Sequence, residues 1–186
     1  KVNDYLYILP GNLNLYQIEV SAGSGKENRL KKYLKEMERI HQFDYVVIDT
    51  PPTPSVWMTS ALIASNYYIM PIKPDPISFT GMSLLQSIIR QKQNDFDLDL
   101  TCIGIVLTMT KHNTIVYNKC LETINGNESH KKLLISQDIP DRTDIPKYQM
   151  NQQFILDFGN PQLKLNLTSI VNEIINRIDK YEANKQ

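Results

Sequence analysis

A carboxylate that directly follows a short apolar run is the group in this chain best placed to do chemistry. Residues 45–48 read Tyr-Val-Val-Ile and lead to Asp49. Apolar residues on both faces predict an interior strand of a parallel sheet, and Pro51 and Pro52 end it. Open α/β sheets bind ligands at the carboxyl ends of such strands, so Asp49 is a candidate metal ligand. An Asp that only opens a turn before proline gives the same pattern.

The rest of the chain alternates between segments with strand and helix patterns. Alternation of this kind predicts an α/β fold with a doubly wound, mainly parallel sheet flanked by helices. Strands are predicted near Tyr5–Leu9, Tyr45–Ile48, Tyr67–Met70, Ile103–Thr108 and Leu133–Gln137. Helices are predicted at Glu27–Ile40, Val56–Ala64, Phe79–Gln93, Thr114–Ile124 and Leu163–Tyr181.

Size and composition narrow the class of protein. A chain of 186 residues suits one domain covering 1–186. Lys and Arg number 20 and Asp and Glu number 20, so net charge argues neither for nor against nucleic acid. No apolar run approaches the roughly 20 residues that cross a bilayer. Cys102 and Cys120 lack metal-site spacing, and no zinc site is assigned to the three scattered histidines. These features predict a reduced, cytoplasmic setting without a membrane.

Five blocks, in order, resemble the ParA/Soj/MinD family of partition ATPases, most closely its ParA branch. They are Leu6–Asn12, Phe43–Pro52, Thr59–Pro74, Phe79–Leu85, and Ile103–Met109 together with Ile139-Pro140. The resemblance implies a P-loop NTPase-like fold, with this chain as the C-terminal two-thirds of a ParA-type ATPase domain. It also implies that the N-terminal part, with the P-loop, precedes Lys1. In the family the P-loop strand pairs with the strand before Asp49, so residues 45–48 are expected to expose apolar surface here and residues 1–186 are not expected to fold alone.

The family's phosphate-binding motif, Lys-Gly-Gly-x-Gly-Lys-Thr, is not in this sequence. Ser21–Glu27 has a similar glycine-rich composition, but Ser21 replaces the first lysine and Ala22 the first glycine. Glu27 stands where the Mg²⁺-binding hydroxyl belongs, and its carboxylate would repel phosphates. A flexible loop before a helix is the better interpretation of this segment.

The resemblance implies a role for Asp49 and for the residues that follow it. Asp49 would be the Walker B residue that holds the Mg²⁺ of bound ATP, through a water molecule. Thr50, Pro51 and Pro52 would form the switch loop that senses the γ-phosphate. The two prolines also stiffen the exit from a strand, and both interpretations can hold together.

The resemblance also places the adenine at two later strand ends. After Ile139-Pro140 the family continues into an Ala-rich helix start, whereas this chain reads Asp-Arg-Thr-Asp-Ile-Pro-Lys. Asp141 is therefore either a nucleotide contact or a surface residue. The residues expected to line the base are Thr108, Met109, Ile139, Pro140 and Asp141.

The partners follow from the family as well. They are a second copy of the chain in an ATP-dependent homodimer, duplex DNA bound without sequence preference, and a centromere-binding ParB-type protein that stimulates hydrolysis. The protein would then be associated with the nucleoid. Arg90 and Lys92 are the leading DNA-binding candidates, although each is equally a solvated charge. Further candidates are Lys111, Lys119, Lys131 and Lys132.

Two other functions fit part of the pattern. Bacterial tyrosine kinases also have Asp-Thr-Pro-Pro at this point, but they end in a tyrosine cluster, and residues 181–186 contain one tyrosine. A non-catalytic adaptor could keep the fold without the P-loop. A Lys-Gly-Gly-x-Gly-Lys-Ser/Thr motif encoded upstream of Lys1 would favour an ATPase, and its absence would favour the adaptor.

Overall fold

The computed structural model describes residues 2, 4–12, 20, 23–51, 53–157 and 159–185. The chain divides into two compact units, Lys1–Ser65 and Asn66–Gln186. The assignment of residues 1–186 to one domain stays a prediction. Within the described residues, none of the helices is both long and apolar enough to cross a membrane.

The first unit is built on two helices. The short 3₁₀ helix η1 (Lys26–Asn28) leads into α2 (Arg29–Glu38), and α3 (Val56–Ala64) follows later in the unit. Ser55 caps the start of α3, and its Oγ accepts a hydrogen bond from the Met58 N–H at 3.3 Å. Helix α2 packs against α3. Both helices predicted for this part of the sequence are confirmed.

The two strands predicted in the first unit are wrong. Tyr5–Leu9 and Tyr45–Ile48 belong to no strand. A β-strand needs a neighbour for its backbone groups, and no described residue forms a ladder with either segment. The expected apolar exposure at residues 45–48 is found, because Val47 is 90% exposed.

The second unit is a parallel sheet with order β1-β2-β3. The strands are β1 (Tyr67–Ile72), β2 (Thr101–Thr110) and β3 (Ile139–Pro140). Helices fill both intervals between the strands, as parallel connections require, and the predicted α/β class is confirmed. Helix α4 (Pro76–Phe96) joins β1 to β2, and α5 (Ile115–Asn125) and α6 (Glu128–Leu133) lie between β2 and β3. After β3 follow α7 (Asp144–Met150), the 3₁₀ helix η2 (Ile155–Asp157) and α8 (Pro161–Ala183).

The long helices start where their sequences provide caps. An Asp-Pro pair opens α4, and Asp75 accepts a hydrogen bond from the Ser78 N–H at 2.8 Å. An Asn-Pro pair opens α8, and Asn160 accepts from the Leu163 N–H at 2.9 Å. Proline at the first helical position has no N–H that would need a partner. The cap residues therefore fix where each helix leaves the sheet.

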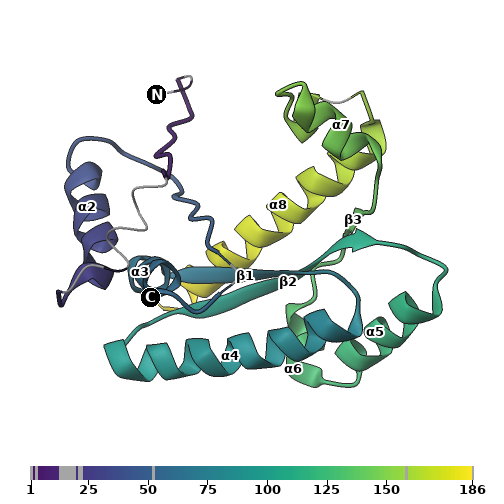
Figure 1. Ribbon diagram of the computed structural model, residues 1–186, viewed down its shortest axis with the longest axis horizontal. Coiled ribbons are helices and arrows are strands. Elements are labelled where there is room, and N and C mark those ends of the chain that lie inside the picture. Colours follow the sequence, from purple (N-terminus) through teal and green to yellow (C-terminus); the bar gives the residue numbers. More distant parts are fainter. Residues whose placement is uncertain are drawn as a thin grey trace. The chain divides into compact units, whose positions relative to one another are not determined.

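Strand β2 supplies core residues to both faces of the sheet. Ile105 and Leu107 pack with residues of α4 and α5, including the fully buried Ile124. Val106, between them, packs with Ile170 of α8 on the opposite face. Within this unit, α4 and α5 lie on one side of the sheet and α8 on the other (Figure 1). This alternation is typical of an interior parallel strand.

The strand predicted at Leu133–Gln137 is also wrong. Asn127 caps α6 by accepting hydrogen bonds from two backbone N–H groups, and the helix extends to Leu133. Leu134 then makes a single bridge to Ile105. Regular pairing with β2 starts only at Ile139, so the third strand lies further along the chain than the apolar run suggested.

Candidate functional site

The carboxyl ends of β2 and β3 bring together the residues that were predicted to line a base. Parallel pairing sets Thr108 beside Ile139 and Thr110 beside Pro140. The Asp141 N–H continues this pairing by donating to the Thr110 carbonyl at 3.0 Å. The residues that were predicted to line the base therefore lie together at one end of the sheet. Parallel α/β sheets bind their ligands at this end.

Met109 is the irregular residue at this end of the sheet. The register between β2 and β3 shifts between Thr108 and Thr110, and Met109 has a φ of +53°. A left-handed conformation at a residue other than glycine costs energy and is common beside functional sites. The Met109 side chain is 51% exposed, so it is available to contact a flat apolar ligand.

Asp141 is already engaged with a neighbouring cation. Its Oδ2 lies 3.1 Å from the Nζ of Lys111, which follows β2 directly. This ion pair joins the residues that directly follow β2 and β3. A direct contact between Asp141 and a nucleotide stays a prediction, and such a contact would have to share the carboxylate with Lys111.

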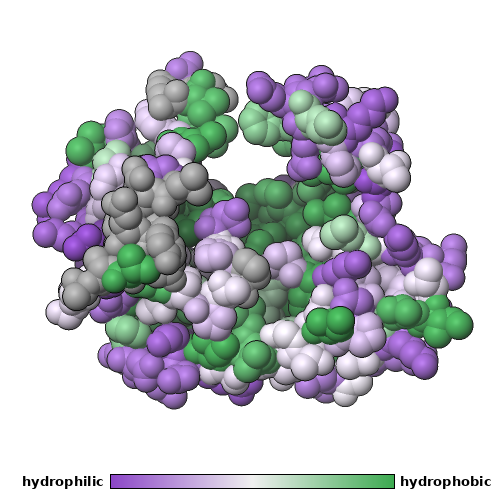
Figure 2. Space-filling view, in the orientation of Figure 1, coloured by the Kyte–Doolittle hydropathy of each residue, from purple (hydrophilic) through white to green (hydrophobic). Residues whose placement is uncertain are grey.

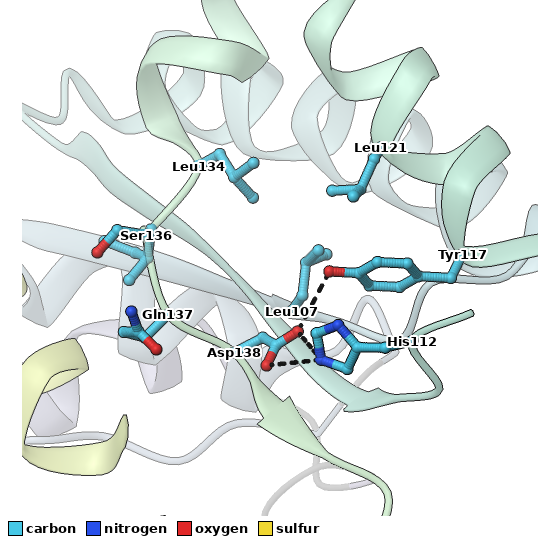
Figure 3. Close-up of a pocket in the computed structure, with 9 residues that line it drawn as sticks. Leu107, His112, Tyr117, Leu121, Leu134, Ser136, Gln137 and Asp138 are labelled. Carbon is cyan, nitrogen blue, oxygen red and sulfur yellow. Dashed lines mark hydrogen bonds and ion pairs between the residues drawn. The ribbon is translucent and has the colours of Figure 1, made fainter. Parts of the chain in front are cut away.

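A cluster of polar side chains lies beside these strand ends and lines a cavity of about 170 Å³. His112 Nε2 lies 3.0 Å from Asp138 Oδ2 and 3.3 Å from Thr110 Oγ1. The Tyr117 hydroxyl donates to the same Asp138 oxygen at 3.4 Å. Figure 3 shows the side chains of His112, Tyr117 and Asp138 pointing toward one another. They come from the β2–α5 loop, from α5 and from the segment before β3, respectively. We call His112, Tyr117 and Asp138 the histidine cluster.

The histidine cluster ties the two base-lining segments together. His112 is three residues after Met109, and Asp138 immediately precedes Ile139. The Asn166 side chain of α8 donates to the Asp138 carbonyl at 3.1 Å and fixes the same segment from another helix. Burial, and then the Asp138 carboxylate, raise the pKa of Tyr117, so this hydroxyl stays protonated as a donor at neutral pH.

Sequence reasoning did not identify this cluster. The three histidines are far apart in the sequence and were assigned no site, and Asp138, 26 residues after His112, was not considered with them. The contact arises because β3 is only two residues long and pairs with the last residues of β2. The residue before β3 therefore lies near the carboxyl end of β2, and the sequence gives no sign of this short pairing.

A second cluster holds the segment that carries Asp138. Arg177 of α8 donates to the carbonyls of Ile103 at 2.9 Å, Leu133 at 2.9 Å and Leu134 at 2.8 Å. It also donates to Glu173 Oε1 at 2.6 Å. We call Arg177 and Glu173 the α8 clamp.

A second set of hydrogen bonds joins the α8 clamp to the chain just before β3. Glu173 Oε2 accepts from the Ser136 N–H at 2.9 Å and from the Ser136 hydroxyl at 2.6 Å. Burial alone would raise the pKa of Glu173, but the Ser136 hydrogen bonds and the Arg177 charge lower it below its ordinary value. The clamp thereby fixes the residues that lead into the histidine cluster.

Asp49, Thr50 and Pro51 belong to the first unit and are exposed there. Pro52, also predicted for the switch loop, lies outside the described residues. No hydrogen bond or ion pair to the Asp49 carboxylate occurs within the described part of the chain. Among those residues, no group of three or more His, Cys, Asp or Glu side chains could hold a metal ion. A single accessible carboxylate nevertheless suits Mg²⁺, which keeps several waters and takes further oxygens from substrate phosphates.

The segment considered as a phosphate loop is described from Gly23 onward, and its residues 21 and 22 lie outside the described part. Gly25 has a φ of +79° and precedes η1 directly. A left-handed glycine at this point lets the chain turn into a helix. The helix predicted after the loop is present.

The leading DNA-binding candidates both lie on α4, but neither is fully free. Lys92 Nζ lies 3.7 Å from Asp95 and sits over the Phe96 ring at 5.7 Å from its centroid. The Arg90 Nε donates to the Gln86 carbonyl at 3.3 Å. Their role in DNA binding stays a prediction.

The sheet order and its flanking helices define a parallel α/β fold, a class that binds ligands at the carboxyl ends of its strands. A family model described as "AAA domain" matches residues 1–102. The chain is 28% identical over 121 residues to the sporulation initiation inhibitor protein Soj of Bacillus subtilis, covering 64% of this chain and 47% of Soj. The chain belongs to this family, the ParA/Soj/MinD family of partition ATPases.

Solved structures share the fold. A putative plasmid partition protein from Borrelia burgdorferi, bound to AMPPNP, is 21% identical with a TM-score of 0.69, over 89% of this chain and 61% of that one. A ParA of pNOB8 bound to nonspecific DNA is 19% identical with a TM-score of 0.54, over 90% and 64%. The chain thus spans between about half and two thirds of the length of these relatives.

Proposed function

We propose that the protein is a partition ATPase that binds Mg²⁺ and ATP at the carboxyl end of its parallel sheet. The observation that carries this proposal is the pairing of β2 with β3, which gathers Thr108, Met109, Ile139 and Pro140 at one end of the sheet. These are the residues that the family resemblance assigned to the adenine. A solved structure with the same fold, the putative plasmid partition protein bound to AMPPNP, supports the proposal.

The base would bind through apolar contact and backbone groups. Met109 presents an exposed thioether side chain from the irregular end of β2, and such side chains pack well on aromatic rings. The histidine cluster and the α8 clamp hold the segments around the two strand ends, and would thereby position these segments for the base.

Asp49 would hold the metal of the bound nucleotide through a water molecule. Bound Mg²⁺ would neutralise charge that develops on the phosphates during transfer. Thr50 and Pro51 follow Asp49 directly, so a change in phosphate contacts would reach them first. They would act as the switch loop together with Pro52.

The further parts of the proposal concern partners. ATP would favour a homodimer, and the dimer would bind duplex DNA without sequence preference. A centromere-binding ParB-type protein would stimulate hydrolysis and release the dimer. The protein would therefore work in the cytoplasm on the nucleoid. The chain carries no net charge, so DNA binding would depend on a local cationic surface and on the two copies that a dimer presents.

Steady-state phosphate release tests the catalytic proposal. The protein at its full natural length is expected to hydrolyse ATP slowly with Mg²⁺, and Asp49→Ala is expected to abolish turnover. Asp44→Ala is the matched control, because it removes an exposed carboxylate five residues earlier in the same unit. Unchanged turnover in Asp49→Ala would remove Asp49 from the site. No turnover in the wild-type protein would favour the non-catalytic adaptor.

A further inference from the structure

Helix α2 and the short helix before it carry a concentration of positive charge in a chain with none overall. Residues 26–39 hold six cations and three acids, an excess of three positive charges. The cations are Lys26, Arg29, Lys31, Lys32, Lys35 and Arg39. The charge is therefore local to one element of the first unit. It was not among the DNA-binding candidates taken from the sequence.

The helical repeat separates this charge from the apolar side of α2. Lys32 and Lys35 lie in α2, and Arg39 is the C-cap residue that follows it with helical backbone angles. Their spacing of three and four residues places them on one face of the helix. We call these three residues the cationic ridge. All three are exposed, whereas Leu30 and Leu34 on the opposite face are half-buried. The surface over α2, at the left of the view, is largely hydrophilic in Figure 2.

The ridge keeps its charge available. Glu36 follows Lys32 by four residues, and Glu38 follows Lys35 by three, spacings that permit ion pairs on a helix. Among the described residues, however, none of the three ridge cations forms an ion pair. Two of the earlier candidate lysines differ, because Lys92 pairs with Asp95 and Lys111 with Asp141.

Packing within the first unit limits the kind of partner. The half-buried apolar face of α2 belongs to a helix that packs against α3. A membrane-surface helix needs such a face free to enter the lipid boundary. A ridge that offers only charge, over about 10 Å of helix, fits a polyanion with closely spaced phosphates.

We propose that the cationic ridge of α2 binds the phosphate backbone of duplex DNA. The inference rests on the DNA binding in the proposed function and names a surface for it that is distinct from Arg90 and Lys92. Each ridge cation neutralises one phosphate and releases its condensed counterions. Binding at this surface reads no sequence, because phosphates carry none.

The test uses the protein at its full natural length with ATP and Mg²⁺, titrated with a random-sequence duplex at several salt concentrations. The ridge variant carries Lys32→Gln, Lys35→Gln and Arg39→Gln, which remove charge but keep good helix formers. The control carries Lys147→Gln, Lys164→Gln and Lys180→Gln, the same change of net charge distributed over α7 and α8. The ridge variant is expected to reduce the slope of log affinity against log salt by about 2.7 for each bound chain. The control is expected to keep the wild-type slope.

Each outcome decides between named alternatives. Equal slopes for the ridge variant and the wild-type protein would overturn the ridge while leaving the proposed function intact. An absence of DNA binding by the wild-type protein would overturn both. Loss of binding to phosphatidylglycerol vesicles with unchanged DNA binding would assign the ridge to a membrane instead. If the triple variant does not keep the wild-type circular dichroism, the three single variants replace it, each with an expected loss of about 0.9 in slope.

Discussion

Replacing Arg177 by Met removes the guanidinium of the α8 clamp and keeps an apolar stem of similar length. The substitution leaves the carbonyls of Ile103, Leu133 and Leu134 without their side-chain donor. It also leaves the Glu173 carboxylate without its cation. The loss of Arg177 is expected to affect stability, because its side chain is only 21% exposed and joins α8 to two other parts of the second unit.

The expected cost follows from these contacts. A hydrogen bond from a charged donor contributes about 1.5–3 kcal/mol, and the values do not add fully. Water can reach the partly exposed site and replace some of the lost partners. We therefore expect Arg177→Met to lower the free energy of unfolding by about 3 kcal/mol, which corresponds to about 6–12 °C in Tm for a chain of this size.

Urea and thermal unfolding of the protein at its full natural length, followed by far-ultraviolet circular dichroism, measure this change. Arg142→Met is the matched control, because Arg142 also lies 2.6 Å from a carboxylate, that of Asp144. Its hydrogen bonds join residues only two positions apart, so no distant elements separate when they are lost and no measurable change is expected. An Arg177→Met protein as stable as the wild type would refute the reasoning that the clamp holds α8 to the sheet.

Two more predictions concern the stability of the second unit. The pKa of Glu173 is lowered from its ordinary value of 4.5, so its stabilisation is present above that pH and is lost as pH falls through the lower folded value. Urea midpoints measured between about pH 6 and about pH 3 should fall more steeply for the wild type than for Glu173→Gln, and parallel curves would contradict this. Gly104→Ala should destabilise by about 1–3 kcal/mol, because the new Cβ would lie 2.9 Å from the Ile135 Cδ1. Gly81→Ala, where no atom lies within 4 Å of the new Cβ, should stabilise α4 by up to about 1 kcal/mol, and equal effects of the two substitutions would argue against the close contact at Gly104.

The sequence predicted those elements whose signals are local. Val56–Ala64 has the predicted bounds, and the helix predicted at Phe79–Gln93 lies inside α4. Side-chain caps and Asp-Pro or Asn-Pro pairs mark such helices within a few residues. The α/β class followed from their alternation with strands and did not need accurate bounds for every strand.

Strand predictions failed where pairing depends on distant residues. Residues 45–48 have the composition of an interior strand, yet no described residue pairs with them. The run Leu133–Gln137 is apolar at its start, but the Asn127 cap directs Leu133 into α6. The composition of a segment shows which side chains a strand there would bury. Whether the strand forms, and in which register it pairs, depends on partner residues elsewhere in the chain.

The candidate site shows the same difference between what the sequence predicts and contacts that depend on distant residues. Thr108, Met109, Ile139 and Pro140 were predicted from the family resemblance, and the structure brings them together at one end of the sheet. The contact between His112 and Asp138 depends on how two strands align over 26 residues, and that between Arg177 and Ile103 spans 74 residues. Neither contact leaves a periodic pattern in the sequence.

Hydrogen exchange followed by mass spectrometry tests most directly whether nucleotide binds where we propose. The protein at its full natural length would be compared with and without ATP and Mg²⁺. Slower exchange is expected in peptides covering residues 108–112 and 138–141, and in the peptide that contains Asp49, with α7 and the end of α8 unchanged. ATP-dependent protection confined to other parts of the chain, with these three segments unaffected, would contradict the account.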